Sequence, residues 1–247
     1  MKRYFNLTLI IFLIGFTNSI SKENIPNPNS SNSNYRIIAA GCLAATSQTE
    51  LNINNVRTII LGGGDMWWDL DNGVYEIPQN SGRHSMFAGA LWIGGLDDQG
   101  NLKVAAMTYR QDGNDFWPGP LGVGEDQAST NQETCTNFDR HWSIYKNDVI
   151  EYRAYLECVN DVMCDPSVIF SNYTIPEVIT NWPAVTESED GSIVNLAPYT
   201  DVNNDGEYTQ GVDYPEYNLD GESSCMDQNM LFGDQSIWWV FNDNGNI

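Results

Sequence analysis

The sequence predicts a mainly β domain, an antiparallel β-sandwich-like fold with long loops and about two short helices. Its apolar runs are short, rich in β-branched and aromatic residues, and bounded by Gly, Pro, Asn and Asp, which is the pattern of strands joined by turns. Few stretches repeat apolar residues at the helical period. Apolar residues make up 41% of the chain and aromatic residues 12%, which is enough to build a core and excludes disorder throughout.

The amino-terminal segment has the parts of a secretory signal peptide. A basic start, Met1–Arg3, precedes the mostly apolar Tyr4–Phe16 and a small polar stretch, so we expect residues 1–21 to be removed on export. The apolar run is too short to span a bilayer comfortably, so we expect no membrane span after cleavage. The alternative is that the segment stays uncleaved as an anchor. Residues 22–34 are rich in Asn, Ser and Pro and predict a flexible leader. Residues 35–247 are then expected to form a single β-rich domain.

The first strand signals lie in the amino-terminal half of this domain. Asn55–Leu61 is a β-branched run that ends at Gly62–Gly64, so we predict a strand followed by a tight bend. Ser85–Ile93 and Asn101–Arg110 are two further runs. Turn residues Gly94–Gly100 separate them, so this region predicts a β-hairpin.

The remaining elements are two strands and two helices. His141–Tyr145 and Ser236–Phe241 are predicted strands. Asn147 is a suitable cap for a helix over residues 148–156, where Val149, Tyr152 and Leu156 share one face. Residues 175–182 predict a second helix, with Pro176 in its first turn.

The chain is strongly acidic, and its charge is unevenly distributed. Thirty-three acidic and eleven basic residues give a formal net charge of −22, which argues against nucleic acid or anionic lipid as a partner. The last basic residue is Arg153, and seventeen Asp and Glu follow it. These carboxylates require solvation, shifted pKa values or bound cations; most of them are expected on a solvated surface.

One segment of this acidic half predicts a calcium site. Asp201, Asn203 and Asp205 occupy positions 1, 3 and 5 of an EF-hand-type loop, with Gly206 at position 6 for the sharp turn. Further expected ligands are the position-7 residue Glu207, through its carbonyl, and Asp213. Asp213 lies one residue beyond position 12, where the pattern has Val212. The alternative is an Asx-rich turn without a metal, although no Lys or Arg is near in the sequence to offset these charges.

Five cysteines follow the signal segment, at positions 42, 135, 158, 164 and 225. Cys158 and Cys164 bracket a short loop and predict one disulfide in an exported protein. No second pair is assigned from the sequence. A zinc site is not expected, because the spacings are irregular and only two His are present.

The eight tryptophans allow either a core or a sugar-binding function. Adjacent Trp pairs that straddle a strand favour the core. A Gly- and Pro-rich loop holds Asp112, Asp115 and Trp117, which form a weaker candidate site for a sugar or cation. We recognise no catalytic constellation, although a glycosidase needs only two suitably separated carboxylates.

Several long motifs resemble the N-terminal region of large secreted surface proteins of Bacteroidetes, which typically carry a C-terminal type IX secretion sorting domain. The similarity covers most of the chain after residue 42, and its motifs lie at Asn55–Arg57, Gly64–Leu70, His84–Leu121, Leu196–Pro215 and Leu231–Asp243. The resemblance implies export to the cell surface or medium and no established activity for this region. Such proteins are usually far longer and end in the sorting domain, which is missing here, so we expect this chain to be a fragment of one.

We therefore expect a secreted or cell-surface structural or adhesive domain, stabilised by Ca²⁺ and without catalytic activity of its own. Its expected partners are a surface glycan or another surface protein, together with downstream domains of a longer chain. The alternative is a carbohydrate-binding module or a glycoside-hydrolase-associated domain.

Overall fold

A computed structural model describes residues 41–97, 99–107, 114–124, 128–219 and 229–244. The expected signal peptide and leader lie outside the described residues, as do Asp112 and Cys225. Among the described residues, no helix is both long and apolar enough to cross a membrane.

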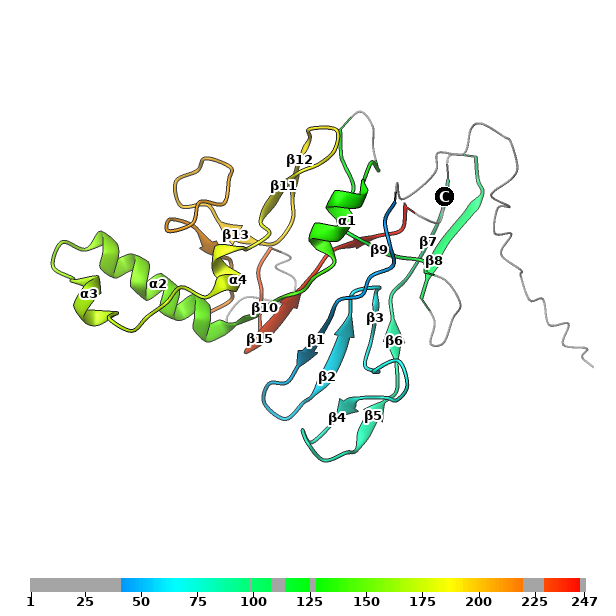
Figure 1. Cartoon of the computed structure of the whole chain (residues 1–247), viewed down its shortest axis with the longest axis horizontal. Coiled ribbons are helices and arrows are strands. Elements are labelled where there is room, and N and C mark those ends of the chain that lie inside the picture. Colours follow the sequence, from blue (N-terminus) through cyan, green and yellow to red (C-terminus); the bar gives the residue numbers. More distant parts are fainter. Residues whose placement is uncertain (1–40, 98, 108–113, 125–127, 220–228, 245–247) are drawn as a thin grey trace, which may run out of the picture. The chain divides into compact units, whose positions relative to one another are not determined.

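The largest sheet in the described part of the chain has four antiparallel strands in the order β1-β2-β3-β6 (Figure 1). Its β-branched centre is the predicted strand after Asn55, shortened to four residues, and a turn at Gly62–Gly63 leads into β3 as expected. The strands are β1 (Gln48–Leu51), β2 (Thr58–Leu61), β3 (Asp65–Met66) and β6 (Gly89–Ala90).

The other strands of the described residues form antiparallel pairs, so the mainly β, antiparallel character is confirmed. The two-layer arrangement of a sandwich stays a prediction. The pairs are β4 (Tyr75–Glu76) with β5 (His84–Met86), β7 (Trp92–Leu96) with β8 (Leu102–Ala106), β9 (Trp117–Pro118) with β16 (Phe241–Asn242), β10 (Trp142–Tyr145) with β15 (Gln235–Trp238), β11 (Val185–Glu187) with β12 (Ile193–Asn195), and β13 (Tyr199–Thr200) with β14 (Tyr214–Pro215).

A hairpin forms from β7 and β8, but its turn lies later than expected. The prediction of Ser85–Ile93 as one strand is wrong, because this run is divided among β5, β6 and the start of β7, which pair with different strands. Gly94 and Gly95 belong to β7 and pair with Val104 and Lys103. The reversal begins at Asp97, whose carboxylate accepts the backbone N–H groups of Gln99 at 3.0 Å and Asn101 at 2.8 Å. This Asx turn, rather than the glycine pair, sets the position of the bend.

The described residues contain four helices, two more than expected. They are α1 (Gln132–Phe138), α2 (Lys146–Asn160), α3 (Pro166–Ile169) and α4 (Glu177–Thr180). The prediction of Asn147 as the cap of α2 is wrong: Tyr145 is the cap residue, and the Asp148 carboxylate accepts its N–H at 3.1 Å. The short α1 and α3 begin after Asn131 and Asp165, whose side chains accept N–H groups of the first turn.

The main hydrophobic core forms around α2. Val149, Tyr152 and Leu156 of its predicted apolar face are buried against β10, α4 and the segments that follow. The other buried members are Trp142, Ile144, Ile179, Trp182, Ala184, Ala197 and Tyr217. Because Tyr199, Tyr208 and Tyr214 also pack against this core, the acidic loop between β13 and β14 is attached to it.

Two disulfides link cysteines of the described residues. Cys158 pairs with Cys164, which confirms the predicted bond. Cys42 pairs with Cys135 of α1, 93 residues away, and this pair could not be assigned from the spacing. The second bond ties the first described residues to the middle of the chain.

Replacing each disulfide by two serines is expected to destabilise the protein unequally. Removal of Cys42–Cys135 should lower the free energy of unfolding by roughly 2 kcal/mol more than removal of Cys158–Cys164, because the longer loop restricts the unfolded chain more strongly. Chemical denaturation of the two double variants and the unaltered protein measures this difference. Equal losses would show that loop length does not govern the effect.

His141 is a partly buried histidine whose two ring nitrogens have no hydrogen-bond partner among the described residues. Its ring lies edge-on to Trp239, with centroids 5.4 Å apart. Burial lowers the pKa of His141 from 6.5 to about 4, and the nearby Asp139 carboxylate opposes only part of this shift. The imidazole is therefore neutral in the folded protein at neutral pH.

His141 should make the fold less stable as the pH falls from about 6.5 to about 4. In this window the unfolded chain protonates the imidazole and the folded chain does not, so acid favours unfolding. His141→Phe should reduce the pH slope of the unfolding free energy by less than about 1.4 kcal/mol per pH unit, the slope for one full proton. Denaturation at several pH values tests this, with His84→Gln on exposed β5 as the control; identical slopes for all three proteins would contradict it.

Candidate metal centre

The candidate centre is the loop that joins β13 to β14. The two strands pair through Tyr199 with Pro215 and Thr200 with Tyr214, so the loop leaves and returns at one place. A hydrogen bond from the Thr200 hydroxyl to the Glu216 carboxylate extends this closure. Residues 201 and 213 at the two ends of the loop are thereby brought together.

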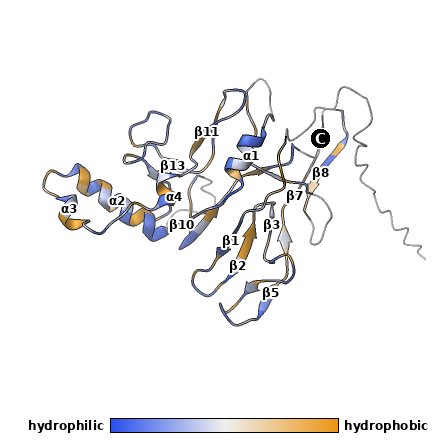
Figure 2. Ribbon diagram, in the orientation of Figure 1, coloured by the Kyte–Doolittle hydropathy of each residue, from blue (hydrophilic) through white to orange (hydrophobic). Residues whose placement is uncertain are grey.

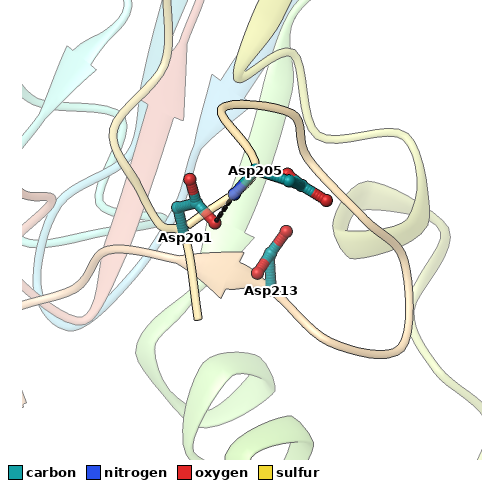
Figure 3. A group of neighbouring side chains, drawn as sticks. All are labelled: Asp201, Asp205 and Asp213. Atoms are coloured by element: carbon teal, nitrogen blue, oxygen red, sulfur yellow. Dashed lines mark hydrogen bonds between the residues drawn. The ribbon is translucent and has the colours of Figure 1, made fainter. Parts of the chain in front are cut away.

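Three carboxylates of this loop converge (Figure 3). Asp201, Asp205 and Asp213 each offer an oxygen, and these oxygens all lie within 4.8 Å of one another. Asp213 is fully buried, Asp201 is half-buried and Asp205 is exposed. The group is therefore open on one side and closed on the other. The structure places Asp213 with the other two despite its displacement from position 12.

Each of these carboxylates also accepts hydrogen bonds from the loop backbone. Asp213 accepts the N–H groups of Val202 at 2.8 Å and Thr209 at 2.7 Å. Asp201 accepts those of Asp205 at 3.2 Å and Gly206 at 2.8 Å. The side chains thus shape the loop that carries them. Because a carboxylate has about four lone-pair sites, these bonds leave acceptor capacity in all three groups.

The loop needs backbone conformations that only a few residue types adopt easily. Asn204 and Gly206 have positive φ values of 58° and 80°, and Asn and Gly are the residues best suited to that region. The turn directs the N–H groups of Asp205 and Gly206 toward Asp201. The Asn-Asp-Gly sequence is thus explained by the path of the chain.

Tyrosines attach the loop to the core. The Tyr208 hydroxyl donates to the carbonyl of Ile179 in α4 at 2.9 Å, and its ring meets Tyr199 edge-on. The Tyr152 hydroxyl of α2 accepts the N–H of Gly211 at 2.9 Å. Burial raises the pKa of Tyr208 and of Tyr152, so both hydroxyls stay protonated and neutral.

The group carries negative charge that no described ion pair offsets. Hydrogen bonds from the Glu207 N–H and the Asn203 amide lower the pKa of Asp205, so this carboxylate remains ionised in mildly acidic solution. The guanidinium of Arg153 stacks on the ring of Tyr214, 4.9 Å from its centroid. A cation bound among the three carboxylates would offset their mutual repulsion.

The other two expected ligands, Asn203 and Glu207, do not point their side-chain oxygens into the group of three carboxylates. The Asn203 amide donates to Asp205 at 2.6 Å, so its carbonyl oxygen must turn toward an ion to act as a ligand. The Glu207 side chain is exposed and lies outside the group of three carboxylates. Its backbone carbonyl is the atom that the position-7 prediction invokes.

Two residues of the weaker candidate site, Asp115 and Trp117, make structural contacts, and the third, Asp112, lies outside the described residues. The Asp115 carboxylate accepts the N–H of Ala106 in β8 at 2.7 Å. Trp117 is half-buried in β9 and pairs with Asn242 of β16. Trp92 of β7, which the sequence did not distinguish from the other tryptophans, has 68% of its surface exposed.

Comparisons with known proteins give no assignment: no protein-family model, no curated protein and no solved structure matches this chain.

Proposed function

We propose that this chain is a secreted or cell-surface β-sandwich-like domain with a structural or adhesive role, whose loop 201–213 binds Ca²⁺. The observation that carries the proposal is the convergence of Asp201, Asp205 and Asp213 within 4.8 Å. Its place in a large exported Bacteroidetes surface protein rests on the sequence resemblance, and its two disulfides agree with export. The proposal assigns no catalytic activity to the domain.

Calcium fits the donor set better than other common ions. All donors of the proposed site are carboxylate, amide or carbonyl oxygens on one irregular loop, and Ca²⁺ accepts six to eight such ligands in flexible geometry. Mg²⁺ requires near-ideal octahedral geometry and retains several waters. Zn²⁺ favours His and Cys, and the group contains neither.

The proposed ion would join the start of the loop to its end. Asp201 and Asp205 belong to the first turn and Asp213 directly precedes β14, so a shared cation fixes both segments. Asp213, the ligand from the end of the loop, is the buried carboxylate of the three. An ion that binds only the folded chain stabilises it by mass action.

Calcium should therefore raise the melting temperature of the protein relative to a chelator. At a free concentration 100 times the Kd, the gain is about 2.7 kcal/mol. Asp205→Ala should remove the difference between calcium and chelator, and Tb³⁺ luminescence excited through Tyr199 and Tyr208 should report the ion directly. Asp205 is chosen because it is exposed, whereas loss of the buried Asp213 would also disturb the fold.

Asp97→Asn is the matched control, because Asp97 is a partly exposed carboxylate that shapes another Asx turn. This variant should retain the full calcium response. A melting curve of the unaltered protein that is the same in calcium and chelator would refute the calcium proposal.

A carbohydrate-binding module is the second candidate, and the exposed Trp92 favours it. A flat aromatic ring on the surface can stack against a sugar. Its surroundings are unlike a sugar site, however, because its neighbours on the same face of the hairpin are the exposed Leu96, Leu102 and Val104. Leucine and valine side chains cannot hydrogen-bond to sugar hydroxyls, so these neighbours argue against a sugar site.

A glycan array separates these two functions. Under the structural or adhesive proposal, no glycan should bind the protein through Trp92. We therefore expect no glycan whose binding to the unaltered protein is lost in the Trp92→Ala variant. If such a glycan is found, and the control Trp117→Phe in half-buried β9 retains it, the carbohydrate-binding function replaces the structural one.

A further inference from the structure

The far end of α2 presents an unusual apolar surface, which we call the tip surface. Two of its side chains are almost fully exposed: Val162 at 98% and Met163 at 89%. Val168 and Ile169 of α3, each 66% exposed, follow closely in the sequence, and Figure 2 shows the hydrophobic character of this short helix. The tip surface consists of Val159, Val162, Met163, Val168 and Ile169.

Covalent and hydrogen bonds hold the loop that carries this surface. The Cys158–Cys164 disulfide closes it at both ends. Within it, the Asp161 carboxylate accepts the N–H of Met163 at 2.9 Å, and the Cys164 N–H donates to the carbonyl of Asp161 at 3.0 Å. The exposed side chains are therefore displayed on a fixed backbone, and little conformational entropy is lost when a partner covers them.

Hydrogen bonds and aromatic contacts also fix α3, the helix that follows this loop. The Asp165 carboxylate accepts from both the N–H and the hydroxyl of Ser167 at the start of α3. Tyr155 of α2 meets the rings of Phe170 and Tyr173, which follow α3, at centroid distances of 5.6 and 5.3 Å. This aromatic cluster attaches α3 to α2, so the two parts of the tip surface belong to one unit.

The charged side chains next to the tip surface in the sequence are negative. Glu157, Asp161 and Asp165 are exposed beside it, and hydrogen bonds from Ser167 keep the pKa of Asp165 low. No Lys or Arg occurs anywhere after Arg153. A partner that covers these apolar side chains must supply the positive charge itself.

We propose that the tip surface is a docking site for another protein, one that offers an apolar surface with Lys or Arg at its rim. Charge complementarity selects this occupant. A second copy of the chain would bring a net charge of −22 toward the same carboxylates, and an anionic membrane would also repel them. This inference does not depend on the cation site.

The test uses a defined cationic probe, a fluorescent amphipathic helix built from Leu and Lys, titrated into the full chain. Binding should be saturable at one peptide per chain, and salt should weaken it. Val162→Ser with Met163→Ser should weaken it at least tenfold, because the variant loses the free energy of burying two apolar side chains against the peptide. A peptide with Glu in place of Lys, and one with Ser in place of Leu, should not bind.

The matched control is Leu96→Ser with Leu102→Ser, which removes two leucines exposed at 72% and 71% on a different element. This variant should bind the Leu/Lys helix as the unaltered protein does. Equal affinity of the tip variant and the unaltered protein would overturn the proposal, as would absence of saturable binding. So would tip-dependent binding to phosphatidylcholine or phosphatidylglycerol vesicles, or a concentration-dependent dimer in sedimentation that the tip variant abolishes.

Discussion

The constraint that governs the carboxyl-terminal half of this protein is the lack of positive side chains after Arg153. Carboxylates in this region have no Lys or Arg close after them in the sequence, and several of the described ones accept N–H and O–H groups instead. Asp190 is a clear case: bonds from Ser188 and Ser192 lower its pKa to about 2. The loop 201–213 follows the same rule, but it draws three carboxylates into one small volume. That concentration is the reason why we propose a cation site in this loop.

The hydrophobic pattern of the sequence predicted where helices and strands lie, whereas the hydrogen bonds of turn residues, which decide where these elements end, were harder to predict. The apolar face of α2 was visible because Val149, Tyr152 and Leu156 follow the helical period, and all three are buried. Element boundaries were less accurate, because side-chain hydrogen bonds decide them. The hydrogen bonds of Asp97 place the hairpin turn later than the glycines suggested. Asp165 caps α3, which is too short to show a helical repeat of apolar residues. Strands β2, β8, β10 and β15 were therefore predictable, whereas β1, the paired short strands such as β11 and β12, the exact turns and the short α1 and α3 were not.

In the candidate metal site, too, the residues close in sequence were predictable and those brought in by the tertiary fold were not. The spacing of Asp201, Asn203 and Asp205 pointed to the loop, because alternate positions of a tight turn face one point. Asp213 could be included only as an exception, since its arrival depends on the pairing of β13 with β14. The Cys42–Cys135 bond, which joins residues 93 apart, depends on the tertiary fold. The exposure of Trp92 likewise has no local signal in the sequence.

Helix α2 connects the two surfaces to which we assign functions. Tyr152 on its buried face holds Gly211 of the acidic loop, and its last turn leads into the disulfide-closed loop of the tip surface. An open groove of about 410 Å³ lies between them, lined by α2 residues Arg153 and Leu156 and by Val202 and Val212 of the acidic loop. Because Val202 and Val212 directly follow and precede the proposed ligands Asp201 and Asp213, an ion that fixes the acidic loop also fixes one wall of this groove. The core around α2 thus supports both surfaces, so the two proposals concern parts of one packed unit.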